Sequence, residues 1–307
     1  MSVTAETVRQ LRERTGAGMM ECKRALVETG GDLDAAAELM RKQGLAKADK
    51  KAARVAAEGV IVIEKSADGH AAAMVEVNCE TDFVAREQDF RGFAADVARA
   101  ALAARTSSLE ALLAATLPSG ESVDERRRAL IAKIGENISV RRVVFVQGQG
   151  PLGAYVHGTR IGSLVALEAG DAELARDLAM HVAASNPKYL SAAQVPADEV
   201  AKEREILTEQ AKGDPKNQGK PANILAQIVE GKVRKALSEI TLLGQPFVRD
   251  DKVSVEKLLA GAKARIAAFE RFEVGAGIEK RQDDFASEVM AQVQASDRGR
   301  GDPGTQH

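Results

Sequence analysis

Apolar residues recur at helical spacing near the start of the chain and predict three short helices. The first helix carries Val8 and Leu11, and the second carries Leu26. The third begins after Asp32, whose side chain can accept the first backbone N–H groups of a helix. We therefore predict a three-helix module over residues 1–46. Its core is so small that some apolar surface should stay outside.

Met19 and Met20 are neighbours in the second predicted helix and cannot both face one narrow seam. We expect one of them in the core and the other as a contact for a partner, because methionine suits adaptable surfaces. The alternative is that both are partly buried within the module. The basic segment 47–54 then follows without an apolar stripe, and we interpret residues 47–57 as a linker with a solvated charged face.

Runs of strand length then predict two β-hairpins, formed by residues 59–63 with 73–77 and by residues 153–157 with 163–167. A helical pattern follows each hairpin. Residues 93–98 and 174–179 share the order apolar, Ala, any residue, Asp, apolar, Ala. This match indicates a duplicated hairpin-plus-helix unit. The predicted fold class is α+β, with a core of two related subdomains.

The remaining patterns fill the spaces between and after these units. Residues 107–137 look helical with an interruption at 118–120, and 138–146 read as a strand. Charged helices at 196–212 and 221–237, with sparse apolar residues, predict an antiparallel helical hairpin that protrudes into solvent. A last helix is expected at 283–293, before a tail from Ser296 that should be disordered.

These predictions define an order of domains along the chain. It consists of a three-helix module at 1–46, a linker at 47–57, a first core subdomain at 58–146, a second core subdomain at 147–195 and 238–282, a helical hairpin at 196–237 inserted into it, and a C-terminal helix and tail at 283–307.

One turn, at residues 78–85, has an unusual composition. A strand-like run ends before it and a helical pattern follows, so Thr81 or Asp82 can cap the helix. The cap does not explain the large aromatic residue that comes next, Phe83. Either Phe83 folds back onto the core near Phe90, or it points outward to a partner.

Composition limits the possible functions. The 307 residues suggest two or more domains, and 43 basic against 45 acidic residues give no basic excess for a DNA partner. Cys22 and Cys79 lie far apart, no charged and apolar leader precedes them, and no apolar run approaches a membrane span of about 18 residues. We expect a cytoplasmic protein without a membrane contact. Aromatic residues make up only 3%, which favours helix-rich packing over an aromatic-lined ligand pocket.

Candidate chemistry is sparse. Residues 148–153 match a dinucleotide-binding fingerprint, but Pro151 and a strand-like run replace the helix that would hold the pyrophosphate. The phosphate-binding loop of GTPases does not occur, so we expect no direct nucleotide binding and no cofactor. The four histidines are scattered without metal-ligand spacing. Cys79 could act as a nucleophile with His181 as its base, but a cysteine at a strand end is more often plain core.

Several segments resemble the bacterial elongation factor Ts family. They are residues 11–20 (LRERTGAGMM), 75–84 with the turn described above, 133–137 (KIGEN), 181–185, 244–248 and 271–275, so the likeness covers nearly the whole chain. Proteins of this family are guanine-nucleotide exchange factors for elongation factor Tu. The resemblance implies a ubiquitin-associated fold for the N-terminal module, which packs on a helix of the GTPase domain. It also implies a core with antiparallel sheets and a protruding arm. The arm would contact either the partner or a second copy of the chain, in a two-to-two complex that contains a homodimer. The tail from Ser296 departs from the family pattern.

The resemblance also implies roles for particular residues. The turn residues Thr81, Asp82, Phe83 and Val84 would dislodge Mg²⁺ from elongation factor Tu. The partner-binding residues would be Arg12, Met19, Met20 and Lys23 of the N-terminal module, Ile134 as a supporting contact, and His157 toward another domain of the partner. Two rival hypotheses remain. One is an adaptor that binds a partner without changing it, and the other is a cysteine-dependent enzyme.

Overall fold

The computed structural model describes residues 3–279, without the side chains of residues 45–49. Its larger helices are α1 (Ala5–Thr15), α2 (Met19–Glu28), α3 (Leu33–Lys51), α5 (Gln88–Ala104), α7 (Val123–Ile134), α8 (Ala172–Ser185), α9 (Ala197–Gly213) and α10 (Ala222–Ile240). Shorter helices are α4 (Asp82–Arg86), α6 (Leu109–Ala114), α11 (Val255–Gly261), η1 (Ala192–Gln194) and η2 (Pro215–Asn217). The strands are β1 (Glu58–Lys65), β2 (Ala71–Cys79), β3 (Ser139–Gln147), β4 (Leu152–His157), β5 (Ile161–Ala169), β6 (Pro246–Phe247), β7 (Asp250–Ser254) and β8 (Arg265–Glu273).

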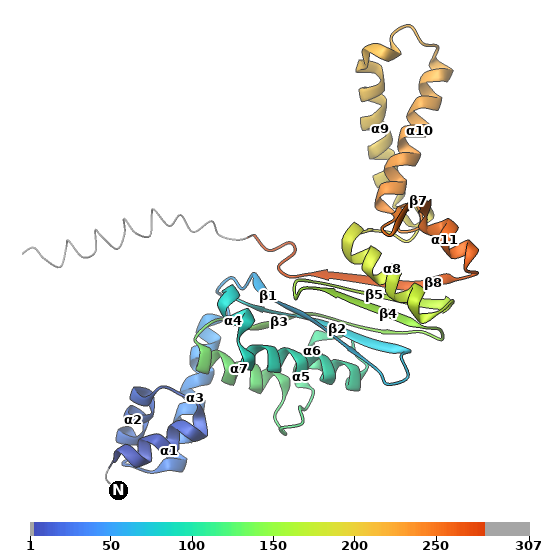
Figure 1. Ribbon diagram of the computed structural model, residues 1–307. Coiled ribbons are helices and arrows are strands. Elements are labelled where there is room, and N and C mark those ends of the chain that lie inside the picture. The colour runs from blue at the N-terminus through green and yellow to red at the C-terminus, as the bar shows by residue number, and fades with distance from the viewer. Residues whose placement is uncertain (1–2, 280–307) are drawn as a thin grey trace, which may run out of the picture. The chain divides into compact units, whose positions relative to one another are not determined.

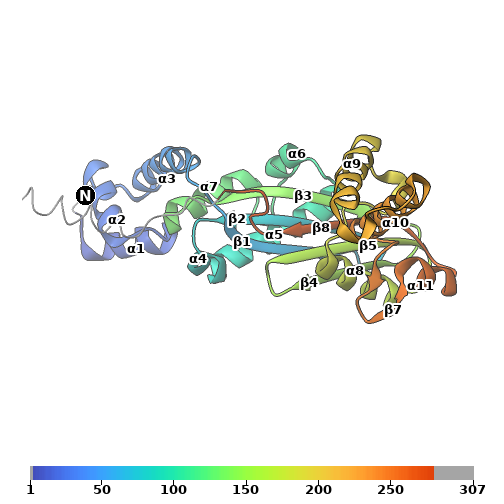
Figure 2. The same ribbon diagram turned by 90° about the horizontal axis from the view of Figure 1, so that it is seen from above.

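The strands form two antiparallel three-stranded sheets, in the orders β1–β2–β3 and β4–β5–β8, and β6 and β7 form a small separate hairpin. In Figure 1 the two larger sheets lie one over the other, and Figure 2 shows their strands running in the same general direction. Helices and antiparallel sheets therefore occupy separate layers, which confirms the predicted α+β class.

Three hydrophobic clusters build these layers. One lies between the first sheet and helices α4 to α7 and contains the buried Phe90 and Phe93. A second lies between the second sheet and α8. The third joins the two sheets, with Met74 from β2 and Leu164 from β5. Both faces of the first sheet are therefore covered, and each residue of β2 is buried. Two-sided burial explains why β2 is mostly apolar in sequence, with Glu76 and Asn78 as buried polar exceptions.

The two core units repeat one plan, as the matching helices predicted. In each unit a hairpin is followed by a helix, α5 or α8, that packs on it, and a later strand, β3 or β8, then pairs with the second strand of the hairpin. The helix α8 lies so close to β4 that a Cβ atom at Gly153 would approach the carbonyl oxygen of Ala175 to 1.9 Å. A glycine is required at this contact.

The N-terminal helices enclose a small core of their own, made by Val8 and Leu11 of α1, Cys22 and Leu26 of α2, and Ala36 of α3. The hydroxyl of Thr4 caps α1 by accepting the N–H of Thr7 at 3.2 Å. Helix α3 continues to Lys51, so the expected linker at 47–57 begins as helix. Alanine and lysine, which dominate this stretch, are among the strongest helix formers, and this explains the extension.

The charged helices α9 and α10 form the expected antiparallel hairpin, and Figure 1 shows them side by side. Their shared core is thin and comprises Ala211, Val229 and Val233 with half-buried residues from both helices. The Nε of Arg204 lies 2.8 Å from a carboxylate oxygen of Glu230 across the pair. The predicted helix at 283–293 and the tail from Ser296 lie outside the described residues.

Candidate functional site

The turn between β2 and α4 has the predicted strand-to-helix form. Thr81 adopts an extended conformation and its hydroxyl accepts the N–H of Val84 at 3.4 Å, so Thr81 is the cap. The helix that begins here is only five residues long, because Glu87 returns to an extended conformation before α5 starts at Gln88. The continuous helix that we expected from Asp82 onward is therefore broken at Glu87.

Phe83 points outward from this turn. Of its surface, 76% is exposed, whereas the neighbouring Val84 is buried in the core cluster of the first sheet. Asp82 is half-buried, and one of its carboxylate oxygens lies 2.7 Å from the guanidinium of Arg86 on the next turn of the helix. Among the phenylalanines that the structure describes, Phe83 is the one that is exposed. Of the two alternatives, the outward direction is therefore the one observed, and Phe83 does not fold back toward Phe90.

The turn after α7, at residues 135–137, fixes the backbone of the turn between β2 and α4. The carboxylate of Glu136 accepts the N–H groups of Glu80 and Thr81 and the hydroxyl of Thr81, at 3.2, 3.0 and 2.7 Å. In return, Glu80 accepts the N–H of Asn137 at 2.6 Å. Sequence reasoning missed these residues as part of a site, because charged side chains in loops resemble ordinary solvated residues. The signals present were the capping Thr81 and the left-handed Gly135, which ends α7 and turns the chain toward Glu136.

The predicted contacts in the N-terminal module all lie at its surface. Met19 and Met20 are 49% and 73% exposed, and Arg12 and Lys23 are exposed as well. The expectation that one methionine belongs to the core is wrong. Both stand in the first turn of α2, whereas the residues of that helix that face the core begin at Cys22.

Ile134 and His157 lie in different parts of the protein and differ in burial. Ile134 is the last residue of α7 and packs half-buried against the cluster that also holds Val84, two residues before Glu136. His157 is exposed at the end of β4 in the second sheet, where its Nδ1 lies 3.3 Å from the hydroxyl oxygen of Tyr155. The structure thus joins Ile134 to the turn at residues 81–84 through one cluster, and it places His157 on the other sheet.

Cys79 lies directly before the turn but is a poor nucleophile. Burial, with a contribution from the nearby carboxylates of Glu136 and Glu58, raises the pKa of its thiol to about 12. Its Sγ lies 3.2 Å from the carbonyl oxygen of Thr81, to which the thiol donates. His181 belongs to a different cluster, where its Nε2 lies 3.0 Å from Oε1 of Gln245. The pairing of Cys79 with His181 in a catalytic dyad therefore lacks support in the geometry.

The glycine-rich segment 148–153 does not form a nucleotide site. It connects β3 to β4, so a strand follows it where a dinucleotide fold needs a helix N-terminus. Within residues 3–279, no three His, Cys, Asp or Glu side chains are placed together so that they could hold a metal ion. No helix of that part is both long and apolar enough to cross a membrane.

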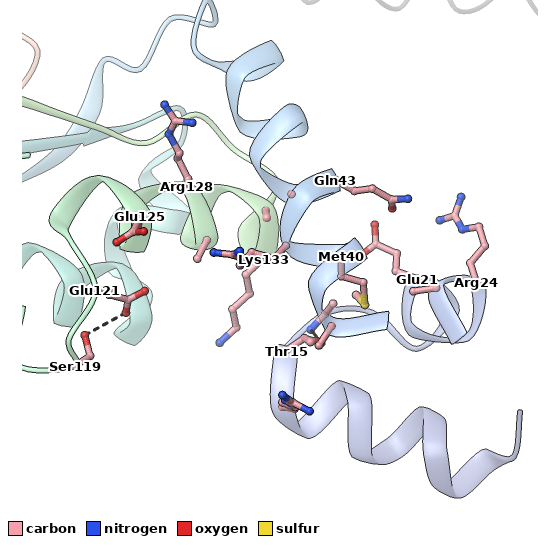
Figure 3. A pocket seen from close by; sticks show the side chains of 18 of the residues that line it. Thr15, Glu21, Arg24, Met40, Gln43, Ser119, Glu121, Glu125, Arg128 and Lys133 are labelled. Carbon is pink, nitrogen blue, oxygen red and sulfur yellow. Dashed lines mark hydrogen bonds between the residues drawn. The ribbon is translucent and has the colours of Figure 1, made fainter. Parts of the chain in front are cut away.

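One large cavity, of about 930 Å³, lies between the N-terminal helices and α7. Figure 3 shows side chains of α2 and α3, among them Arg24 and Gln43, on one side of it and Glu125 and Lys133 of α7 on the other. Its wall carries both basic and acidic side chains. The cavity therefore has neither the apolar lining of a small-molecule pocket nor the single sign of charge that a phosphate site needs.

These features define a class of protein, an α+β chain in which a turn fixed by hydrogen bonds presents an exposed aromatic ring. A family model described as elongation factor TS matches residues 80–276. The chain belongs to the elongation factor Ts family. It is 59% identical over 297 residues to elongation factor Ts of Methylococcus capsulatus, a match that covers 96% of this chain and 100% of the relative.

Two further relatives give the same result. Elongation factor Ts of Alkalilimnicola ehrlichii is 54% identical over 297 residues, covering 96% of this chain and 100% of the relative. The protein of the same name from Francisella tularensis subsp. novicida is 55% identical over 292 residues, covering 95% and 99%. The family is one of nucleotide exchange factors in translation elongation, and the chain has that role.

Proposed function

We propose that the chain binds elongation factor Tu in its GDP form, in the cytoplasm, and accelerates GDP release so that GTP can load. Membership of the elongation factor Ts family supports this partner. The single observation that carries the proposal is the 76% exposure of Phe83 on a turn whose backbone is fixed by hydrogen bonds. An aromatic ring exposed to water gains free energy when a partner buries it.

In this proposal Phe83 and Asp82 enter the GTPase near the switch that supports its magnesium site. Thr81 caps the turn and Val84 anchors it in the core, so the aromatic ring is presented from a fixed base. The inserted ring displaces the switch and dislodges Mg²⁺. Because the ion compensates the charge of the phosphates, its loss weakens the binding of GDP.

Energetics require more contacts than this turn provides. Nucleotide and exchange factor weaken each other by the same factor, because binding free energies are linked. A shift of about 10⁴-fold needs about 5.5 kcal/mol, whereas burying one phenylalanine contributes roughly 1.5 to 3 kcal/mol. We therefore propose that the remaining contacts come from the residues predicted for partner binding: Arg12, Met19, Met20, Lys23, Ile134 and His157.

An exchange factor makes and breaks no covalent bond, so the proposed role is not that of an enzyme and needs no cofactor. Its whole effect is on the rate at which a ligand leaves another protein. A thiol with a pKa near 12 at Cys79 agrees with a role in the core.

The helical hairpin is proposed as a second contact, either with elongation factor Tu or with a second copy of the chain in a two-to-two complex. Ile206 and Ile224 are exposed on its two helices, and a partner would cover them. Light scattering of the purified complex, with Ile206→Ser and Ile224→Ser together as the variant, distinguishes these uses. A two-to-two mass that falls to one-to-one in the variant identifies the homodimer contact.

The decisive experiment follows release of a fluorescent GDP from elongation factor Tu at increasing concentrations of the chain. Phe83→Ala should slow the maximal release by about ten- to a hundredfold, which corresponds to the 1.5 to 3 kcal/mol of one buried phenyl group. Val55→Ala, which shortens another exposed apolar side chain outside the proposed contacts, is the matched control. An unchanged release rate with the unmodified chain would instead identify a non-catalytic adaptor.

A further inference from the structure

The direction in which Phe83 leaves the turn is not set by its own helix. Helix α4 spans only Asp82–Arg86, and a helix of five residues is not stable without outside contacts. On its C-terminal side the chain turns away at Glu87. The contacts that fix the orientation of Phe83 must therefore come from the N-terminal side of the turn and from other parts of the chain.

Val84 supplies one of these contacts by packing in the core, and Glu136 supplies the polar ones. Its Oε2 accepts the N–H groups of Glu80 and Thr81, and its Oε1 accepts the hydroxyl of Thr81. An ionised carboxylate is an acceptor at both oxygens, and hydrogen bonds to it are stronger than those to a neutral group. A single side chain thus holds two consecutive peptide groups and one hydroxyl, and the aromatic ring follows two residues later.

The hydroxyl of Thr81 transmits this orientation into the helix. A hydroxyl has a single proton, and here the proton is donated to Glu136 at 2.7 Å. The lone pairs of the oxygen are then directed elsewhere, and one of them accepts the N–H of Val84 at 3.4 Å. Glu136 therefore fixes the cap through Thr81, and the cap fixes the first turn of α4, which carries Phe83.

The turn that carries Glu136 is itself fixed by hydrogen bonds, both to Glu80 and to the segment after α3. Glu80 accepts the N–H of Asn137 at 2.6 Å, and its other carboxylate oxygen lies 3.2 Å from the guanidinium of Arg54. The side-chain amide of Asn137 donates to the carbonyl oxygen of Arg54 at 2.7 Å. Lys51, the last residue of α3, donates to the carbonyl oxygen of Gly135. The two turns and the segment after α3 therefore form one hydrogen-bonded frame.

We propose that Glu136 is a positioning residue for nucleotide exchange. Its carboxylate orders the turn at residues 80–83 in the free chain, so that binding energy from Phe83 is not used to order the turn when the partner arrives. The inference rests on the proposed function, because it assigns to Glu136 an effect that passes through Phe83. Glu136 itself need not touch the GTPase or its nucleotide.

The test compares Glu136→Gln with Glu125→Gln in the fluorescent GDP assay. Glutamine keeps the shape of the side chain, but its amide nitrogen cannot accept a hydrogen bond, so at least one of the three donors loses its acceptor. We expect the maximal release rate to fall about tenfold. The concentration for half-maximal effect should change less than twofold, since the N-terminal contact surface is intact. Glu125 is an exposed residue of α7, the helix that ends just before Glu136, and its variant controls for the loss of one negative charge. Glutamine also serves at the N3 position that Glu125 occupies in the capping box of this helix.

A double-mutant cycle with Phe83→Ala separates positioning from a general structural role. If Glu136 acts through Phe83, then Glu136→Gln slows release in the unmodified chain and has no further effect in the Phe83→Ala background. Two independent slowing effects that multiply would overturn the inference. Normal release by Glu136→Gln beside slow release by Phe83→Ala would overturn this inference alone, whereas normal release by Phe83→Ala would overturn the proposed function as well.

Circular dichroism and the urea midpoint show whether Glu136→Gln folds. If it does not, Thr81→Val removes the same hydrogen bond from the donor side. Valine has the shape of threonine without the hydroxyl, so the bond to Glu136 and the cap on Val84 are both lost. The same fall in maximal rate, again absent in the Phe83→Ala background, would support the inference. Unchanged release by a folded Thr81→Val protein would contradict it.

Discussion

Phe83 and Phe90 are seven residues apart, yet Phe83 is 76% exposed and Phe90 is completely buried. The extended conformation of Glu87 between them explains this difference, because it separates α4 from α5 and lets each helix take its own direction. In one continuous helix, residues seven apart would share a face. The break thus releases Phe83 from the face on which Phe90 packs.

The two phenylalanines should therefore differ in their effect on stability. Phe90→Ala should lower the free energy of unfolding by about 3 to 5 kcal/mol, since it removes a buried ring and leaves a cavity. Phe83→Ala should change it by no more than about 0.5 kcal/mol, the usual effect of a surface substitution. Urea unfolding followed by circular dichroism measures both. A loss in Phe83→Ala as large as that in Phe90→Ala would place Phe83 in the core.

The parts of the fold that rest on local patterns could be predicted from the sequence. The hairpins β1–β2 and β4–β5, with α5 and α8 after them, have short connections and clear periodicity. The strand β8 was not recognised, because it pairs with β5 about a hundred residues earlier and its polar residues break the apolar pattern. The small hairpin β6–β7 and helix α11 were missed because both are very short.

The candidate site could be predicted only in part, for a related reason. The strand-to-helix turn and its cap at Thr81 are local, and the sequence indicates both. The direction of Phe83 depends on the break at Glu87, which is neither proline nor glycine and gives no breaker signal. The bond from Glu136 to Thr81 joins residues 55 positions apart, and no local pattern reports such a pairing.

Cys79 should be chemically inert in the folded protein. With a thiol pKa of about 12, almost none of it is thiolate at neutral pH, and Cys22 is buried as well. A charged thiol reagent at pH 7.5 should modify neither cysteine in the native state and both after unfolding in urea. Cys79→Ala should retain GDP release within about twofold. A folded Cys79→Ala protein without activity would instead favour the cysteine-dependent alternative.

Glu76 should be among the most costly residues to replace. It is completely buried on β2, and its carboxylate lies 3.1 Å from the guanidinium of Arg141 and 2.5 Å from that of Arg142, while also accepting the N–H of Gly275 at 2.8 Å. Glu76→Ala leaves these groups without their acceptor and should cost about 3 to 5 kcal/mol. Glu230→Ala, which breaks the exposed pair with Arg204, is the control and should cost less than about 1 kcal/mol. Equal midpoints in urea for the two variants would contradict this prediction.

His181 should make stability depend on pH. Burial lowers the pKa of its imidazole from the ordinary value of 6.5, although the hydrogen bond with Gln245 acts in the opposite direction. The N–H of Val248 donates to Nδ1 at 3.2 Å, so the neutral ring has its proton on Nε2 and donates it to Gln245. Protonation of Nδ1 would place two N–H groups against each other.

The sign of the effect follows from which state, folded or unfolded, binds the proton more tightly. The unfolded chain protonates this histidine near pH 6.5 and the folded chain only at lower pH, so the unfolded state binds more protons as the pH falls. The stability from His181 is fully present above pH 6.5 and is lost below it, by up to about 1.4 kcal/mol per pH unit. Urea midpoints between pH 7.5 and 5.5 should therefore fall more steeply for the unmodified chain than for His181→Gln, which cannot titrate. The control is His70→Gln, which removes an exposed histidine and should keep the steep slope. Equal slopes for the unmodified chain and His181→Gln would show that the imidazole of His181 is not the group responsible.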